Sequence, residues 1–99
     1  MEKILLAKEV VYDYNKAFEF LDKGKNVIDI GYNPDTWALI GYELTYKNFD
    51  ERLSYYLKHN SNCAPVLYCD VLIFDNESKI DIPKGNYEIG IVSELNEEK

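Results

Sequence analysis

The chain lacks glutamine and has very little arginine. Its 99 residues include one Arg and no Gln, and 18 acidic residues against 11 basic ones give a net charge of −7. Nucleic acids attract basic proteins through their phosphates, and no cluster of Lys and Arg offers a local exception. The composition therefore argues against direct binding to nucleic acid. An acidic surface suits solubility or docking onto a basic partner.

Long apolar runs and common catalytic motifs are also missing. No apolar run exceeds a dozen residues, so we expect no membrane-spanning helix. The segment Met1–Glu9 has a short apolar core and no small-residue cleavage site, which predicts a strand rather than a signal peptide, and a protein that stays inside the cell. Because the chain has no Gly-rich phosphate loop, zinc-ligand spacing or nucleophile elbow, we expect no cofactor and no metal site.

The two cysteines, Cys63 and Cys69, are spaced too widely for a zinc knuckle or a redox pair. Along an extended strand they would lie roughly 20 Å apart, which is too far for a disulfide. We expect Cys69 to be a small core residue and Cys63 to be a loop thiol. A disulfide through Cys63 across a dimer is the alternative.

Residues 64–75 form the longest nearly apolar stretch, and their β-branched and aromatic content predicts a strand. Both alternating sides of this strand are apolar, so it needs cover on both faces. One polar residue, Asp70, interrupts it.

The remaining patterns predict a single α+β domain over residues 1–99, with a mostly antiparallel sheet and two amphipathic helices. Asp13 as N-cap and Gly24 as C-terminal stop bound one helix over 13–23, and a second apolar stripe predicts a helix over 49–60. The stretch 37–46 fits either a helix or a strand, and its alternation after a turn favours a strand. The other expected strands are 3–11, 25–32, 79–82 and 87–93, and the polar tail 95–99 is expected to be frayed.

This order, β-α-β-β-α-β followed by two short strands, matches the ferredoxin-like plan. That plan places the strand 64–75 at an edge of the sheet. Its two apolar faces would then need cover from the added strands 79–82 and 87–93 or from a second subunit, so a homodimer is one expectation.

Acidic residues inside apolar strands are candidates for chemistry. Asp29 lies between two Ile residues, and Asp70 lies within the predicted strand 64–75. On a shared face they could act as a catalytic carboxylate pair or bind a divalent cation. The alternative is that each points to a solvated face of the sheet. His59, the single histidine, is expected to neutralise a helix C-terminus, and a Cys–His pair with Cys63 is the less economical interpretation.

Tyrosine is unusually abundant, with nine residues in the chain. Tyr side chains are enriched in protein interfaces, where the hydroxyl tolerates a wet rim. An exposed set surrounded by carboxylates suits a protein partner, although the same residues could simply fill the margin of a small core. The candidate binding residues are Tyr42, Tyr46, Tyr55 and Tyr56.

Three segments, Lys3–Val11, Gly31–Ile40 and the strand 64–75, resemble a family of small proteins from filamentous and rod-shaped archaeal viruses, the lipothrixviruses and rudiviruses. The resemblance runs over the full length of the chain. It implies a viral protein that acts in the host cytoplasm, in a hot and acidic setting, and it implies no enzyme residues.

Three functions follow as hypotheses. The first is a non-enzymatic viral accessory protein that binds a host or viral protein through an acidic, Tyr-bearing surface, for example by blocking a basic host complex. The second is a small metal-dependent hydrolase or nuclease that uses Asp29 and Asp70. The third is a minor component of the virion.

Overall fold

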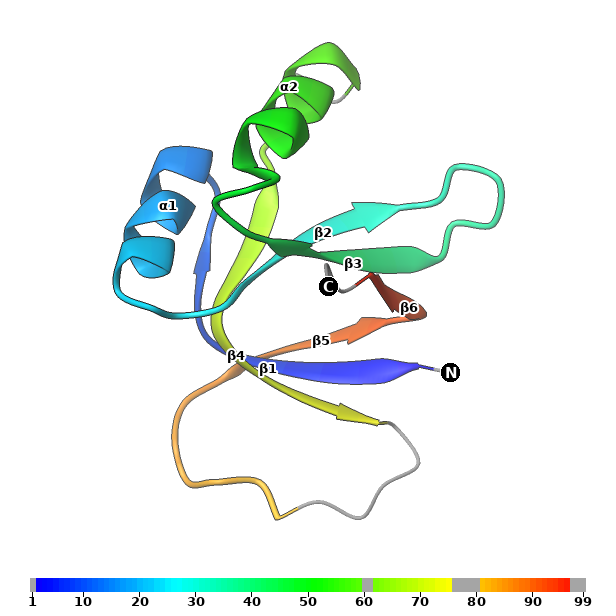
Figure 1. Cartoon of the computed structure of the whole chain (residues 1–99). Coiled ribbons are helices and arrows are strands. Elements are labelled where there is room, and N and C mark those ends of the chain that lie inside the picture. The colour runs from blue at the N-terminus through cyan, green and yellow to red at the C-terminus, as the bar shows by residue number, and fades with distance from the viewer. Residues whose placement is uncertain (1, 60–61, 76–80, 97–99) are drawn as a thin grey trace.

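The computed structural model describes residues 2–59, 62–75 and 81–96. It confirms an α+β domain with two helices and one mostly antiparallel sheet (Figure 1). Within the described residues, neither helix is long and apolar enough to cross a bilayer. The elements are β1 (Lys3–Val11), α1 (Tyr14–Asp22), β2 (Val27–Tyr32), β3 (Leu39–Leu44), α2 (Phe49–His59), β4 (Val66–Asp75), β5 (Glu88–Val92) and β6 (Glu94–Asn96).

Local signals in the sequence set several of these boundaries. The Asp13 carboxylate accepts a hydrogen bond from the Asn15 N–H at 2.7 Å and caps α1, as predicted. Gly24, with φ +74°, adopts the left-handed conformation that ends this helix. Between β2 and β3, Asn33 Oδ1 accepts a bond from the Asp35 N–H at 2.9 Å, which forms the expected turn.

The order of the strands differs from the ferredoxin-like prediction. The sheet runs β5-β1-β4-β2-β3-β6, so β4 lies between β1 and β2 and is antiparallel to both. The expectation that this strand lies at an edge is therefore wrong. A central position pairs the backbone groups of β4 on both of its edges, and its two apolar faces are covered by separate hydrophobic cores.

The two ends of the sheet are joined by a nearly continuous strand. β5 pairs with β1, β6 pairs in parallel with β3, and only Ser93 separates β5 from β6. The Ser93 N–H donates to the Leu39 carbonyl at 2.8 Å, so the sheet curls until its edges meet (Figure 1). The expected frayed tail is therefore wrong for residues 95–96, which belong to β6, and 97–99 lie outside the described residues.

The short strand expected over 79–82 is not formed by those of its residues that the structure describes. Residues 79–80 lie outside the described residues, and residues 81–82 are not in a strand. The strand expected over 87–93 is confirmed as β5.

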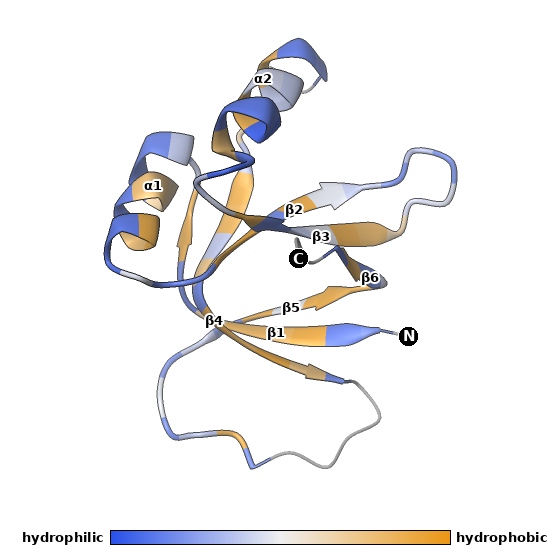
Figure 2. Ribbon diagram, viewed as in Figure 1, coloured by the Kyte–Doolittle hydropathy of each residue, from blue (hydrophilic) through white to orange (hydrophobic). Residues whose placement is uncertain are grey.

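Two hydrophobic cores lie on opposite faces of the curled sheet. The outer core lies between the sheet and the helices, and the inner core lies inside the curl, where side chains from both ends of the sheet meet. Figure 2 shows hydrophobic residues along β1, β4 and β5. The buried members of the outer core are Val11, Tyr14, Ala17, Val27, Leu44, Phe49, Leu67 and Cys69, and those of the inner core are Leu5, Ala7, Ile28, Val71 and Val92.

At Asp70 the regular alternation of side chains along β4 is interrupted. Its φ of +53° lies in the left-handed region, where Asp is found more often than most residues. In a regular strand Cys69 and Val71 would share a face. Here Cys69 belongs to the outer core and Val71 to the inner core. The strand therefore supplies apolar side chains to both cores, which explains the two-sided pattern in its sequence.

Asn26 holds this change of direction in place. Its carbonyl accepts the Asp70 N–H at 2.9 Å, and its amide group bonds both backbone groups of Val71, at 2.6 and 2.8 Å. The Asp70 carboxylate lies 3.7 Å from Lys8 Nζ and 4.0 Å from Lys25 Nζ. The side-chain amide thus continues the hydrogen bonding of the sheet beyond the start of β2.

Candidate functional site

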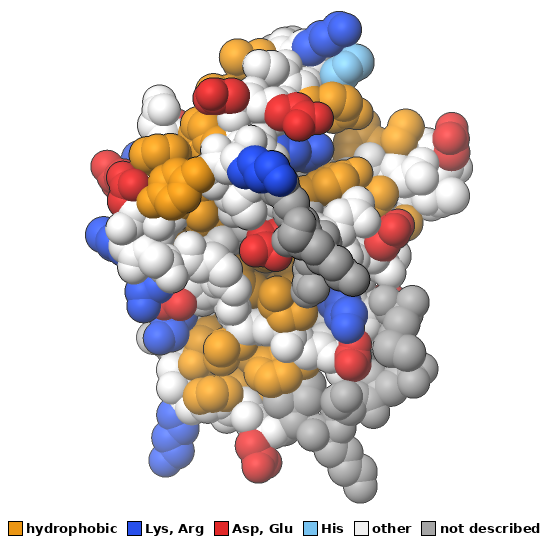
Figure 3. Space-filling model, viewed as in Figure 1, with side chains coloured by type: hydrophobic (Ala, Val, Ile, Leu, Met, Phe, Trp, Pro, Cys, Tyr) orange, Lys and Arg blue, Asp and Glu red, His pale blue; other side chains and the backbone are white. Residues whose placement is uncertain are grey.

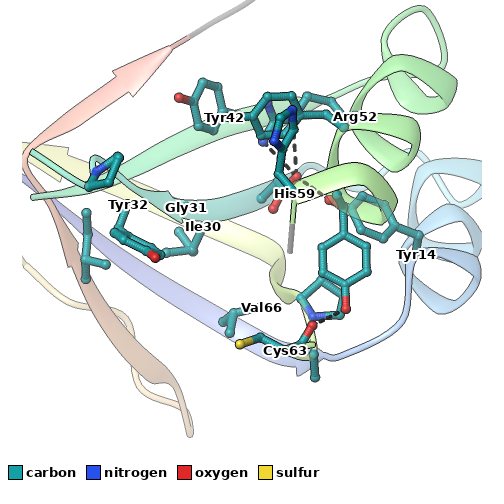
Figure 4. A pocket seen from close by; sticks show the side chains of 16 residues that line it. Tyr14, Ile30, Gly31, Tyr32, Tyr42, Arg52, His59, Cys63 and Val66 are labelled. Carbon is teal, nitrogen blue, oxygen red and sulfur yellow. Dashed lines mark hydrogen bonds and ion pairs between the residues drawn. The ribbon is translucent and has the colours of Figure 1, made fainter. Parts of the chain in front are cut away.

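A pocket of about 510 Å³ lies beneath α2, beside the β2–β3 hairpin. This volume is within the range of ordinary ligand sites. Figure 4 shows Arg52 and His59 on the α2 side of the pocket and Val66 and Cys63 on the opposite side. Aromatic and apolar side chains dominate the lining, which consists of Tyr14, Asp29, Ile30, Gly31, Tyr32, Pro34, Leu39, Tyr42, Arg52, Tyr55, Tyr56, His59, Cys63, Ala64, Pro65 and Val66.

Asp29 supplies a buried carboxylate to this pocket. It follows Ile28, whose side chain lies in the inner core, so strand alternation turns Asp29 toward the helices. Its Oδ2 accepts hydrogen bonds from the Tyr14 hydroxyl at 2.6 Å and from Arg52 Nε and Nη2 at 3.3 and 3.2 Å. These donors replace the water that the carboxylate loses on burial.

Arg52 is held by stacking as well as by charge. Its guanidinium carbon lies 4.0 Å from the centre of the Tyr42 ring and 5.4 Å from that of Tyr55. A guanidinium over an aromatic face gains a cation–π attraction in addition to its ion pair. The only arginine of the chain is thus enclosed by two rings and one carboxylate, and the charges of Arg52 and Asp29 balance within the pocket.

Two phenol hydroxyls of the pocket are committed to structural bonds. Burial raises the pKa of Tyr14 well above its usual value, and the hydrogen bond to Asp29 raises it further, so this hydroxyl remains a donor. The Tyr56 hydroxyl donates to the Cys63 carbonyl and ties α2 to the segment that leads into β4. Because Asp29 is already engaged by its donors, the arrangement suits binding better than proton transfer.

The sequence analysis named four tyrosines, and the structure brings three of them together. Tyr42, Tyr55 and Tyr56 all line the pocket. Tyr46 lies elsewhere, with its hydroxyl donating to Asp22 at 2.8 Å and its ring edge-on to Phe18. That hydrogen bond raises the pKa of Tyr46 above its ordinary value. The predicted Tyr-bearing surface therefore divides between the pocket and the loop after β3.

The two candidate carboxylates have separate surroundings. Asp29 is buried in the pocket with Arg52, whereas Asp70 is partly exposed beside Lys8 and Lys25 and does not line the pocket. Among the described residues, no three His, Cys, Asp or Glu side chains are grouped to hold a metal ion.

His59 and Cys63 both line the pocket, on its opposite sides. The centroid of the His59 ring lies 4.5 Å from that of the Tyr55 ring. Cys63 is an exposed free thiol and Cys69 is a buried one, as expected from the sequence. Burial raises the pKa of Cys69 to about 12, which keeps that thiol protonated and unreactive.

The sequence patterns do not identify Arg52 or Tyr14 as site residues, although both line the pocket. Arg52 lies three residues after Phe49, on the edge of the apolar stripe of α2, and a lone arginine at that position was an available signal. Tyr14 lies within the predicted helix 13–23, and its polar partner on β2, Asp29, is brought to it only when the sheet is assembled.

In comparisons with known proteins, no family model, no curated protein and no solved structure matches the chain.

Proposed function

We propose that this protein is a non-enzymatic binding module that docks onto a basic protein partner through the Tyr-lined pocket beneath α2. The observation that carries the proposal is the convergence of Tyr42, Tyr55 and Tyr56 on one pocket whose Asp29 and Arg52 charges already neutralise each other. Partially exposed aromatic rings around a preformed concave site are typical of the anchor positions of protein interfaces.

The net charge supports a basic partner. At −7, the chain attracts positively charged surfaces over a distance comparable to the Debye length, which raises the rate of encounter. Figure 3 shows acidic and basic side chains interspersed on one face, with hydrophobic side chains in several groups, one of which lies between α2 and the β2–β3 hairpin. Charge would bring the partner to the surface, and the aromatic pocket would supply the short-range contacts.

The resemblance to proteins of archaeal viruses supports a setting for this activity. In that setting the protein is an accessory factor in the host cytoplasm, and blocking a basic host complex is one form that its binding would take. The partner would then be a host protein, or a viral protein made in the same cell.

A pull-down from host lysate with two matched variants tests the proposal. Tyr55 and Tyr12 are both exposed, and Tyr55 lines the pocket whereas Tyr12 does not. We expect wild type and Tyr12→Ala to capture the same partner at low salt, and Tyr55→Ala to retain about one fifth of it or less, as for an interface anchor. Salt of about 1 M should reduce capture by all three, because it screens the charge attraction.

Two results would count against this function. One is a lysate that yields no salt-sensitive partner. The other is a partner that Tyr55→Ala retains as well as Tyr12→Ala, because the contact would then lie outside the pocket. Circular dichroism of both variants checks that neither substitution has disturbed the fold.

A further inference from the structure

An aromatic platform stands at the edge of the pocket. The rings of Tyr32 and Trp37 are stacked, with centroids 5.7 Å apart and planes inclined by 7°. Their side chains are 52% and 78% exposed, so the stack leaves one face of the indole open to solvent. Tyr32 also lines the pocket, which makes the platform continuous with the proposed binding site.

The backbone conformation of Trp37 is strained. Its φ of +60° lies in the left-handed region, which bulky residues rarely adopt. The surrounding loop holds it there, because the Trp37 N–H donates to the Asn33 carbonyl at 2.7 Å and the Asn33 N–H donates to the Ala38 carbonyl at 2.9 Å. An exposed tryptophan in such a conformation contributes little to the core, and strained positions of this kind cluster at ligand contacts.

The pocket itself shows how an aromatic ring and a carboxylate together hold a guanidinium group in this protein. In the pocket, the guanidinium of Arg52 stacks on Tyr42 and pairs with Asp29. The loop of the platform also contains an aromatic ring and a carboxylate, both at the surface. Its open ring is Trp37, and its carboxylate is Asp35, which lies in the same loop and pairs with no described cation. A planar guanidinium can stack on an indole and bond a carboxylate at the same time, which an ammonium cannot do equally well.

We propose that the partner is anchored by an arginine side chain that stacks on the open face of Trp37, with Asp35 as its counter-charge, while neighbouring residues of the partner enter the pocket. This inference rests on the proposed function and names the chemical group that the site recognises. The net charge of −7 favours a basic segment at this position over an acidic or neutral one.

Intrinsic fluorescence tests the anchor directly, since Trp37 is the only tryptophan in the chain. The probes are three blocked tripeptides, Gly-Arg-Gly, Gly-Lys-Gly and Gly-citrulline-Gly, at matched ionic strength. Single anchored residues bind weakly, so each is titrated to about 20 mM. We expect the arginine peptide to change the Trp37 emission saturably, the lysine peptide to bind at least about threefold more weakly, and the citrulline peptide to have no saturable effect.

A charge-matched pair of variants tests the counter-charge. Asp35→Asn and Asp81→Asn remove the same charge from exposed positions, but only Asp35 lies in the platform loop. We expect Asp35→Asn to weaken binding of the arginine peptide about threefold, as for an exposed ion pair, and Asp81→Asn to leave it nearly unchanged.

The inference is overturned if the arginine peptide produces no saturable change, or if citrulline matches it. Equal effects of the two Asn variants would overturn the assignment of Asp35. These outcomes leave the proposed function standing whenever the lysate experiment still shows loss of the partner with Tyr55→Ala. If Tyr55→Ala retained the partner while the arginine peptide still bound, the arginine site would be separate from partner binding at the pocket.

Discussion

The guanidinium of Arg52 lies 3.2 Å from the carboxylate of Asp29 and joins α2 to β2 across the pocket. Both side chains are largely buried, at 19% and 5% exposed. Phe49 is the only buried residue of α2, so this ion pair and the Tyr56 hydroxyl bond help to fix the helix against the sheet. These polar contacts therefore act together with the apolar packing of Phe49, Leu53 and Tyr56 to set the position of the helix and the shape of the pocket.

Replacing Arg52 with Met should destabilise the protein strongly. The substitution leaves the Asp29 carboxylate buried without its cation, and such losses cost about 3–5 kcal/mol of unfolding free energy. The double variant Asp29→Asn/Arg52→Met removes both charges and should recover most of that loss. Urea denaturation of the three proteins measures the difference. A double variant no more stable than Arg52→Met would show that the ion pair is not the cause.

Asp70 is expected to act through its backbone conformation more than through its carboxylate. Glycine adopts φ +53° without steric cost, whereas a β-branched residue does so poorly. Asp70→Gly should therefore stay within about 1 kcal/mol of wild type, and Asp70→Val should lose about 2 kcal/mol more. Thermal or chemical unfolding gives both values. If the two variants were equally stable, the left-handed turn in β4 would not be a requirement of the fold.

The hydroxyl of Tyr14 should make the protein sensitive to high pH. Its folded-state pKa is raised, so the folded protein keeps a proton that the unfolded chain releases above about pH 10. Stability is therefore complete below pH 10 and falls as the pH rises, by up to about 1.4 kcal/mol per pH unit for this group. Tyr14→Phe should be less stable at neutral pH and should show a shallower alkaline decline.

Burial also raises the pKa values of Tyr68 and Cys69, so part of the alkaline decline should persist in Tyr14→Phe. The relevant measurement is the slope of unfolding free energy against pH between 10 and 11 in both proteins. Identical slopes would mean that Tyr14 loses its proton as readily in the folded protein as in the unfolded chain.

The two thiols should differ in reactivity. Cys63 is exposed, and Cys69 is fully buried with a pKa raised to about 12. A thiol reagent at pH 8 should therefore modify one equivalent in the folded protein and two after denaturation. Cys63→Ser should abolish the fast reaction. Rapid labelling of two thiols in the folded protein would place Cys69 at the surface instead of in the outer core.

Local patterns predicted both helices and most of the strands, because the signals for each of these elements lie within it. Asp13, Gly24 and the turn at Asn33 act over a few residues, and the structure confirms each of them. The order of the strands depends on contacts between distant segments, which those signals do not contain. The two-sided apolar run of 64–75 did indicate a strand with two covered faces, but the ferredoxin-like analogy moved it to an edge.

The candidate site was predicted in part for the same reason. Tyr42, Tyr55 and Tyr56 could be selected from the abundance of Tyr and from their positions on a predicted strand and helix. Their convergence on one pocket follows from the pairing of β2 with β3 and the placement of α2. Asp29 was conspicuous in its strand, but its partner Arg52 lies 23 residues further along the chain. A pairing across that distance cannot be derived from residue spacing.

The most direct test of the binding account is to map the contact surface in solution. Isotope-labelled protein is titrated with the basic partner recovered from the pull-down, and shifts of backbone amides and of the Trp37 indole are followed by NMR. The account predicts the largest shifts at Trp37, Tyr42 and Tyr55, around the pocket. Shifts centred instead on the exposed residues Ile89 and Ile91 of β5, with the pocket unchanged, would contradict it.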